Sequence, residues 1–507
     1  MIQHSRILTL HPQDNIAVAL ADLSADQIDS ATGVKALQPI KQGHKIAICA
    51  IHAGQNILRY GQTIGQATAD IAVGEHVHVQ NLGMGEHTRD YAHASEAKAL
   101  AHSTDERTFD GYRRADGSVG TRNYLGILTS VNCSGSVAKF IAEAAEKSGL
   151  LDDFPNIDGI VPITHGTGCG MSGNNEGYDT LFRTLSGYAQ HPNFGGILLI
   201  GLGCEVMQIA DLVGGRTIRA DGALRYMTIQ QIGGTRKTVE KGLEELRSIA
   251  EIANTATRKP APVSHLMVGM QCGGSDGYSG ITANPALGVA SDILVQHGGT
   301  TILSETSEIY GAEHLLTRRA ETVQVGEKLI ERVKWWEDYT ARNKGEMDNN
   351  PSPGNKRGGL TTILEKSLGA VAKSGSAPLT DVYLFGEKID KKGFVFMDSP
   401  GFDPCSVTGQ IASGANLIVF TTGRGSVSGY MPTPCIKIAT NSEMYARMSD
   451  DMDINCGDIV SDGATLRDKG EEIYEMFISI ASGKKTKSED LGYGGVEFVP
   501  WQIGAVM

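Results

Sequence analysis

The chain has little excess positive charge and no long hydrophobic run. Its 507 residues carry 45 Lys and Arg against 58 Asp and Glu, a net charge of −13, and no segment concentrates the basic residues. Nucleic acids are polyanions, so this balance argues against a nucleic-acid partner. The longest notable apolar run, Gly196 to Gly203, is far shorter than the roughly 20 residues of a membrane helix. We therefore expect neither nucleic-acid binding nor membrane association.

Several sequence signals are also missing. The first residues, Met1 to Asn15, have no basic region followed by an apolar stretch, so we expect no signal peptide and a cytoplasmic protein. Eight cysteines in so large a cytosolic chain argue against a disulfide framework. No Walker lysine motif, GxSxG or dinucleotide fingerprint occurs in the proper context, which disfavours kinases, esterases and dehydrogenases. CxxC spacing and solenoid-type repeats are absent as well.

Glycine is the abundant residue, and its distribution fits an α/β protein. The chain contains 63 glycines, well above the roughly 7% average, as expected for many tight turns between strands and helices. Residues 1–82 alternate short apolar segments with turns and predict a small all-β domain. Residues 83–110 are polar and aperiodic, which indicates a linker. From residue 111 apolar runs alternate with helical patterns, and we expect a central α/β catalytic domain over 111–375 and a C-terminal α/β domain over 376–507.

The apolar runs after residue 111 predict mostly parallel sheets of Rossmann-like topology. Predicted strands of the central domain are 125–131, 159–164, 196–201, 265–270 and 300–304, and those of the C-terminal domain are 393–397, 416–421 and 435–440. Predicted helices are 134–147, 237–253 and 320–342. We interpret Trp335 and Trp336 in the last helix as packing residues.

Four cysteines follow predicted strands of the central domain, and these are Cys133, Cys169, Cys204 and Cys272. Ligands of open parallel sheets bind beyond the carboxyl ends of the strands, where Glu205 and Glu305 also lie. A single buried cysteine is usually a small core residue, but four at successive strand ends suggest a shared metal pocket. Thiolates suit iron, zinc or an iron–sulfur cluster, whereas carboxylates and histidine suit Fe(II), Mn(II) or Mg(II). The residues alone leave these alternatives open.

Histidines offer a second set of metal ligands. His76 and His78 are two residues apart, so on a strand both would point to the same face, as in common HxH metal sites. Exposed turn histidines are the ordinary alternative. His44 and His165 are likewise either functional groups or hydrogen-bonded structural residues.

Two loops are suited to binding a hydroxylated anion. Asn350 to Lys356 contains two prolines and a glycine and would present Asn355 and Lys356 from a rigid turn, with Lys366 close behind. Thr421, Thr422 and Arg424 leave a strand directly, where the guanidinium could hold a carboxylate through two hydrogen bonds. An ordinary rigid loop is the alternative interpretation of the first segment.

At these motifs the chain resembles the altronate and galactarate dehydratase family. The resemblance rests on motifs that cover about residues 110–460, namely Gly111 to Asn123, His165 to Gly170, Ile200 to Glu205, Gln271 to Asp276, Gly280 to Pro285, Asn350 to Lys356 and Phe420 to Gly425. Gly43 to Lys45, Tyr60-Gly61 and Gly74 to His78 are similar to the family's small β-clip (SAF-type) domain. The resemblance implies metal-assisted dehydration of a hexonate or hexarate to a 2-keto-3-deoxy acid, with iron or manganese as the metal.

The resemblance does not single out the substrate. Gly74 to His78 is similar to altronate dehydratases, whereas Gly117 to Asn123 and Met452 to Asn455 are closer to galactarate dehydratases. The family also includes sulfolactate sulfo-lyases, which eliminate sulfite instead of water. A non-catalytic sugar-acid sensor and an iron–sulfur redox or regulatory protein are alternatives from other classes. The sequence is also compatible with a homo-oligomer.

The expected roles of individual residues follow from this chemistry. Removing a proton next to a carboxylate creates a dianionic enediolate, which needs a metal or dense hydrogen-bond donors for stabilisation. We expect His165, Lys356 or Lys366 as the base and Arg424 at the substrate carboxylate. Expected substrate-binding residues are His44, Asn132, Ser275, Asp276, Asn355, Thr421 and Thr422. The expected metal ligands are His76, His78, Cys133, Cys169, Cys204, Glu205, Cys272 and Glu305, for Fe(II) or Mn(II), with an iron–sulfur cluster as the alternative.

Overall fold

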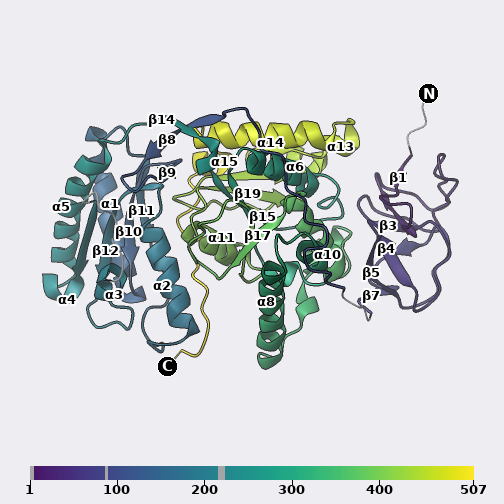
Figure 1. The fold of residues 1–507 in the computed structure, drawn as a ribbon, viewed down its shortest axis with the longest axis horizontal. Coiled ribbons are helices and arrows are strands. Elements are labelled where there is room, and N and C mark those ends of the chain that lie inside the picture. Colours follow the sequence, from purple (N-terminus) through teal and green to yellow (C-terminus); the bar gives the residue numbers. More distant parts are fainter. Residues whose placement is uncertain (1–4, 86–89, 215–222, 507) are drawn as a thin grey trace.

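The protein consists of three parts, an N-terminal β domain, a middle α/β domain and a C-terminal α/β domain (Figure 1). A computed structural model describes residues 5–85, 90–214 and 223–506. Figure 1 shows the N-terminal and middle domains at opposite ends of the molecule, with the C-terminal domain between them. Within the described residues, no helix combines the length and apolar character that a bilayer crossing requires.

The N-terminal domain is built from short antiparallel strands, as the sequence predicts. One sheet has the order β1-β2-β3-β6, with the bounds Ile7–Leu8, Ile16–Ala19, Lys45–Ala47 and His76–Val77. The other has the order β4-β5-β7, with the bounds Asn56–Arg59, Gln62–Ala67 and Leu82–Gly83. Buried Ile16, Ile57, Ile64 and Val77 belong to a core that continues into the C-terminal domain. The two domains therefore share apolar packing.

The predicted linker follows the surface of the C-terminal domain. Residues 90–107 form no helix or strand, but the amides of Ala94 and Glu96 donate to the carbonyls of Thr317 and Arg318. The linker ends slightly earlier than predicted, because β8 (Thr108–Arg113) begins a three-stranded sheet with β9 (Val119–Gly120) and β14 (Lys259–Pro262).

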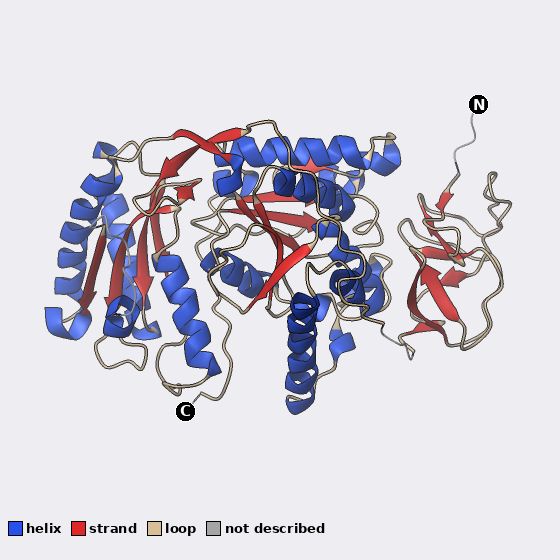
Figure 2. Ribbon diagram, viewed as in Figure 1, coloured by secondary structure: helices blue, strands red, loops and turns tan. Residues whose placement is uncertain are grey.

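The middle domain contains a four-stranded parallel sheet of order β11-β10-β12-β13. Its strands are β10 (Tyr124–Thr129), β11 (Gly159–Ile163), β12 (Phe194–Gly201) and β13 (Leu224–Thr228). Successive side chains of a strand point to opposite faces, and β10 follows this rule. Ile127 packs in a core with α1 (Gly135–Lys147) and α5 (Thr235–Ala253), whereas Leu128 packs with α2 (Glu176–Ala189). Helices thus cover both faces, as Figure 2 shows.

The C-terminal domain is organised around a seven-stranded parallel sheet of order β17-β18-β16-β15-β19-β20-β21. The strands are β15 (Met267–Cys272), β16 (Thr300–Leu303), β17 (Leu379–Tyr383), β18 (Gly393–Met397), β19 (Leu417–Thr422), β20 (Cys435–Ala439) and β21 (Ile454–Asn455). The longer helices are α6 (Ala283–Gln296), α8 (Val323–Arg342), α10 (Ile363–Val371), α11 (Asp403–Ala412) and α14 (Leu466–Ala481).

The mixed α/β fold with mostly parallel sheets is confirmed, but the domain boundary at residue 375 is corrected. Strands on both sides of that position belong to the same seven-stranded sheet, because β15 and β16 pair with β19 and β18. The division instead lies between the four-stranded sheet, whose last helix ends at Ala253, and β15. The packing role of the tryptophans is confirmed, since Trp336 is buried and stacks on Trp501.

Candidate functional site

The N-terminal domain docks on the C-terminal domain through a buried ion cluster. Lys45 Nζ lies 2.9 Å from Glu365 Oε2, and Arg59 Nη1 lies 2.5 Å from Glu365 Oε1. Burial would raise the pKa of Glu365, but the two cations outweigh it and lower the pKa to about 2. Lys45 also donates to the carbonyl of Gly359, and Arg59 donates to the carbonyl of Gly277. These contacts fix the position of β3 and β4 against α10.

A cleft of about 690 Å³ lies beside this cluster and is formed by both domains. We call it the junction cleft. The N-terminal domain contributes Asp22, Lys41, Gln42, Gly43, His44 and His78, and the C-terminal domain contributes Asp276, Tyr278, Lys356, Arg357, Gly358, Gly423, Arg424, Asn441, Glu443, Met444 and Arg447. Five Lys and Arg side chains face three carboxylates in this lining. The junction cleft is therefore suited to a hydrophilic anion.

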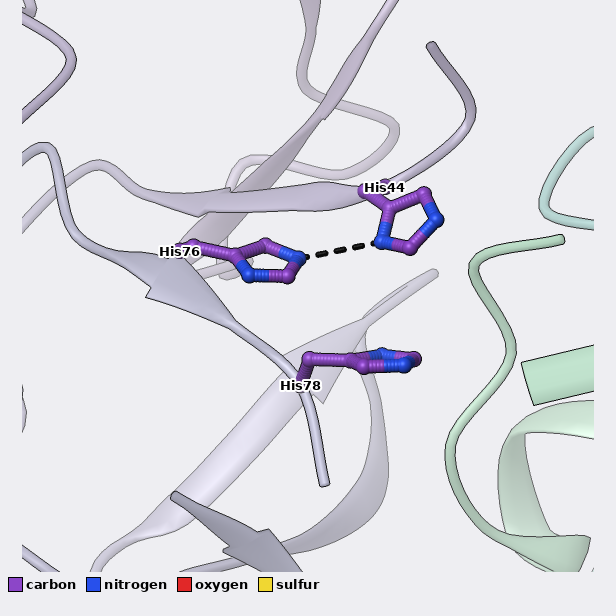
Figure 3. Close-up of side chains that lie close together, drawn as sticks. All are labelled: His44, His76 and His78. Carbon is purple, nitrogen blue, oxygen red and sulfur yellow. Dashed lines mark hydrogen bonds between the residues drawn. The ribbon is translucent and has the colours of Figure 1, made fainter. Parts of the chain in front are cut away.

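Three histidines converge at the N-terminal side of the junction cleft (Figure 3). One imidazole donor atom from each of His44, His76 and His78 lies within 4.8 Å of the other two, and His44 Nδ1 is 3.0 Å from His76 Nε2. The rings of His76 and His78 are stacked with centroids 5.3 Å apart, which confirms that both side chains lie on one face. The turn before β3 supplies His44, and β6 and the residue after it supply the others.

The local environment keeps these imidazoles neutral. Burial, with a contribution from His44, lowers the pKa of His76 to about 4, and burial with nearby Lys45 lowers that of His78 to about 3. Neutral imidazole is the form that binds a metal ion. The Nδ1 atom of His78 is buried without a hydrogen-bond partner among the described residues. The three histidines therefore fit a divalent cation.

The opposite wall presents cations from two turns. Lys356 belongs to the short helix α9 (Pro353–Arg357), which the Ser352 and Asn355 side chains cap reciprocally. Segment 350–356 is thus partly helical, and Asn355 also donates to the Ser275 carbonyl at 2.9 Å. Arg424 is exposed in the turn after β19, where Thr422 Oγ1 accepts hydrogen bonds from the amides of Gly425 and Ser426.

Several expected substrate-binding residues instead support the cleft wall. The carboxylate of Asp276 is buried and accepts hydrogen bonds from Thr440, Ser279 and Asn441. Thr421 Oγ1 donates to Asn284 Oδ1 at 2.6 Å, and both groups are buried. Of the expected residues, His44, Asp276, Lys356, Arg424 and His78 line the junction cleft, whereas Ser275, Asn355, Thr421 and Thr422 lie behind its lining.

A second, smaller cavity of about 430 Å³ borders the same helix α9. We call it the acidic cavity, and its lining includes Cys272, Glu308, Asn350, Lys366 and Asp403. One donor atom from each of Cys272, Glu305 and Glu308 lies within 4.8 Å of the other two. Both carboxylate oxygens of Glu305 are buried, and no residue in the described part of the chain forms a hydrogen bond with them. This set could also hold a cation.

Two lysines partly balance these acids. Lys366 Nζ is 2.5 Å from Glu308 Oε1, and Lys373 Nζ is 3.0 Å from Cys272 Sγ. Burial and the neighbouring Glu308 and Asp403 raise the pKa of Glu305 well above its usual range. Burial with the charge of Glu308 also raises the pKa of Asp403 to about 7. Lys366, expected as a base, is therefore an ion-paired residue of the acidic cavity and does not line the junction cleft.

The prediction that the four cysteines share one pocket is wrong. Cys133, Cys169 and Cys204 are exposed and follow strands of the middle domain, whereas Cys272 is buried at the end of β15. The strand ends look equivalent in the sequence, but they belong to two separate sheets. Within residues 5–85, 90–214 and 223–506, the sets that do form are His44, His76 and His78 in one place and Cys272, Glu305 and Glu308 in another.

The remaining middle-domain candidates have structural roles. His165 is buried, its Nε2 donates to the Thr129 carbonyl at 3.0 Å, and burial lowers its pKa to about 4. Glu205 accepts hydrogen bonds from Ser130 and from the amides of Leu202 and Gly203. Asn132 donates to the His165 carbonyl at 3.2 Å. None of the three lines the junction cleft, so His165 is not its base.

Several charged residues in or beside the two cavities are not among the predicted site residues. Glu308 follows Glu305 by three positions at the same strand end, a spacing that could have identified it. Arg357 directly follows the predicted Lys356. Lys373, Asp403 and Arg447 lie on elements whose approach depends on the sheet order, and no local pattern marks them.

Family models match all three parts of the chain. Residues 5–85 match the altronate/galactarate dehydratase SAF domain, and residues 111–254 match the second domain of D-galactarate dehydratase/altronate hydrolase. Residues 263–506 match the C-terminal domain of D-galactarate/altronate dehydratase. These limits agree with the structural division near residue 254 and with an N-terminal domain that ends near residue 85.

Similar proteins match over most of their length. The galactarate dehydratase (L-threo-forming) of Escherichia coli is 38% identical over 95% of this chain and 94% of its own. The altronate dehydratase of Bacillus subtilis is 35% identical over 95% of this chain and 96% of its own. The (2R)-sulfolactate sulfo-lyase subunit beta of Chromohalobacter salexigens is 33% identical over 76% of this chain and 96% of its own.

Proposed function

The chain belongs to the altronate and galactarate dehydratase family, and from this premise we propose that it removes water from a sugar acid in the junction cleft. The substrate is altronate, galactarate or a close relative, and the product is a 2-keto-3-deoxy acid. The observation that carries the proposal is that two members of the three-histidine set, His44 and His78, line one cleft together with Lys356 and Arg424. Such a cleft offers a metal site on one side and carboxylate recognition on the other.

The histidine set fits a divalent metal ion, with Fe(II) or Mn(II) as our proposal. Imidazoles suit first-row transition metals, and Nδ1 of His78 is buried with no other partner among the described residues. A bound ion would supply a Lewis acid that polarises the substrate and stabilises the developing negative charge. The set Cys272, Glu305 and Glu308 is a second candidate, but Lys366 and Lys373 already contact two of its members.

The cations of the junction cleft bind and orient the substrate. The Arg424 guanidinium is exposed towards the cleft, where its planar fork can donate two hydrogen bonds to one carboxylate. Lys356 is the one residue among the three expected bases that lines the junction cleft. We propose that Lys356 acts as the base in its neutral amine form. Its Nζ takes the proton from the carbon next to the carboxylate and becomes an ammonium, which returns the proton to the departing hydroxyl. The hydroxyl on the next carbon then leaves with a proton as water, and the enol product tautomerises to the keto acid.

Elimination of sulfite from sulfolactate is the second candidate activity. The similarity to the beta subunit of a sulfolactate sulfo-lyase over 76% of this chain favours it. The two activities share the first step, because both remove a proton next to a carboxylate. They differ in the leaving group. The unpaired state of all eight cysteines suits a reducing compartment, and we propose the cytoplasm for either activity.

An anaerobic substrate screen tests the proposed function. Purified protein is incubated with Fe(II) or Mn(II) and a panel of hexonates, hexarates, pentonates and sulfolactate. Formation of a 2-keto-3-deoxy acid from one sugar acid supports the proposal, and sulfite release from sulfolactate supports the second candidate. No elimination from any compound would refute both and favour a non-catalytic sugar-acid-binding protein.

A further inference from the structure

Three exposed cysteines lie at one edge of the middle domain, away from both cavities. β10, β11 and β12 are parallel neighbours in the sheet, so their carboxyl ends meet at one edge. Cys133 follows β10, Cys169 follows β11 and Cys204 follows β12, and each is exposed. Cysteine is among the most buried residue types, so three exposed ones on adjacent loops call for an explanation. Figure 1 shows this sheet at the opposite end of the molecule from the N-terminal domain.

Backbone hydrogen bonds hold the three loops together. The amide of Asn132, next to Cys133, donates to the Thr167 carbonyl at 2.9 Å. The amides of Val206 and Met207 donate to the carbonyl of Gly168, next to Cys169, at 3.1 Å each. These bonds join the loop that carries Cys133 to the loop that carries Cys169, and that loop to the one that carries Cys204, although the three loops are distant in sequence.

Buried polar groups stabilise this arrangement. Glu205 is buried next to Cys204 and accepts three hydrogen bonds within the loop and from Ser130. His165 closes the loop before Cys169 by bonding the Thr129 carbonyl and accepting the Thr167 amide. Gly168 has φ +97°, and a Cβ there would lie 2.1 Å from the Ser130 carbonyl oxygen. These contacts stabilise the backbone of the three loops.

A single tetrahedral ion and a cubane cluster require different spacings of the thiols. Two thiolates on one tetrahedral ion, with metal–sulfur bonds of about 2.3 Å, lie roughly 3.8 Å apart. Among the described residues, the groups of ligand atoms that all lie within 4.8 Å of one another do not include these three cysteines. A cubane cluster binds each cysteine through a different iron, so its ligand sulfurs stand farther apart. Cys133 also precedes α1 by two residues, and the amino end of a helix favours negative charge.

We propose that Cys133, Cys169 and Cys204 bind a [4Fe–4S] cluster through three of its irons. Each thiol loses its proton on binding and becomes a thiolate ligand. Two ferrous ions, two ferric ions and four sulfides come from outside the chain, so assembly needs no further oxidant or reductant. The fourth iron has no cysteine of this set and is open to an oxygen or nitrogen ligand. The assignment does not depend on the proposed dehydration, because the site is separate from the junction cleft and from Cys272.

The test measures cluster content and not activity. The full chain is reconstituted anaerobically with Fe(II) and Fe(III) in equal amounts and with sulfide. Iron, acid-labile sulfide and visible absorbance are determined before and after reduction with dithionite. We expect about four irons and four sulfides per chain. Cys133→Ser, Cys169→Ser and Cys204→Ser should each lose most of the sulfide. Cys49→Ser, at another exposed cysteine, and Cys272→Ser should retain it.

Other results would overturn the assignment. Metal binding without sulfide would indicate a mononuclear site, and equal loss in Cys272→Ser would place the cluster elsewhere. Circular dichroism of the apo forms checks that the variants fold. If a serine variant unfolds, the corresponding alanine variant is measured together with accessible-thiol titration of the folded wild type. Reaction of all three thiols at the same rate with and without reconstitution would then contradict the cluster.

Discussion

The Lys45 ammonium and the Glu365 carboxylate are 2.9 Å apart across the domain junction, and both side chains are wholly buried. Lys45 lies on β3 and Glu365 on α10, so the pair joins elements that are 320 residues apart in the chain. Arg59 completes the cluster. A buried carboxylate between two cations has no access to water, so its removal leaves two buried positive charges facing each other.

Replacement of Glu365 by Gln should therefore strongly destabilise the junction. We expect a loss of about 3–5 kcal/mol, the usual cost of breaking a buried ion pair by removing one partner. Chemical denaturation followed by intrinsic fluorescence measures it. Glu471→Gln is the matched control, because it removes an exposed carboxylate 2.9 Å from Arg467 and should cost about 0.5 kcal/mol or less. Equal effects of the two changes would show that the buried cluster contributes little.

The same carboxylate predicts a dependence of stability on pH. The pKa of Glu365 falls from 4.5 to about 2 on folding, so the unfolded chain binds the proton more readily. The stabilisation is complete above the unfolded value of 4.5 and is lost as the pH falls from 4.5 towards 2. Denaturation midpoints between about pH 5 and about pH 3 should fall less steeply in Glu365→Gln than in the wild type. Parallel slopes in the two proteins would contradict this prediction.

Arg424→Lys should weaken turnover of the sugar acid by roughly 10- to 100-fold, equivalent to about 1.5–3 kcal/mol. An ammonium group retains the charge but cannot donate two parallel hydrogen bonds to a carboxylate. Steady-state kinetics of the variant measures the change in kcat/KM. Arg467→Lys, at an exposed residue of α14, should leave the kinetics unchanged. Wild-type kinetics in Arg424→Lys would make Arg424 a surface residue without a role in binding.

Metal removal should abolish turnover, and Fe(II) or Mn(II) should restore it. His76→Ala and His78→Ala each remove one ligand of the proposed site. Loss of a residue that only hydrogen-bonds a ligand lowers metal affinity roughly 10- to 100-fold, so loss of a ligand itself should lower it further. Metal titration of the apo protein by calorimetry measures this. His52→Ala is the control, because His52 is an exposed histidine of the same domain. If Glu305→Gln abolishes binding while the histidine variants retain it, the metal belongs to the acidic cavity.

His165→Gln should affect stability but not proton transfer. His165 stabilises the loop after β11. Its imidazole is uncharged at neutral pH, because burial lowers its pKa to about 4. We expect a loss of about 1 kcal/mol from the altered hydrogen bonds and an unchanged pH profile of kcat/KM. Thermal unfolding and the pH profile test the two parts. If the variant lost the acidic limb of the pH profile of kcat/KM, His165 would be a catalytic base after all.

The local elements were predictable from the sequence, because apolar runs and helical periodicity are properties of short segments. The strand predicted at 393–397 is β18 with the same bounds, and the helix predicted at 134–147 begins one residue later as α1. The HxH spacing correctly indicated one face for His76 and His78. The turns that carry Lys356 and Arg424 predicted both as candidate anion-binding residues, and the junction cleft contains both.

The arrangement of the sheets was not predictable in the same way. The strand that ends at Cys272 looks like a continuation of the series that ends at Cys133, Cys169 and Cys204. It nevertheless pairs with β16 and β19, because sheet membership depends on side chains of distant strands. The burial of Lys45 and Arg59 could not be predicted from the sequence either. A charged residue on a short strand is normally exposed, and only the approach of Glu365 makes its burial favourable.

The buried cluster at the junction also determines how molecules can enter and leave the cleft. Many enzymes open by swinging one domain away, but here such a movement would pull Glu365 away from Lys45 and Arg59. Separating these charges costs several kcal/mol and would make opening rare. The N-terminal domain is then a stationary wall and not a lid. A ligand of the junction cleft would then enter and leave through the mouth of the cleft, past exposed side chains such as Arg424, without a movement of the domains.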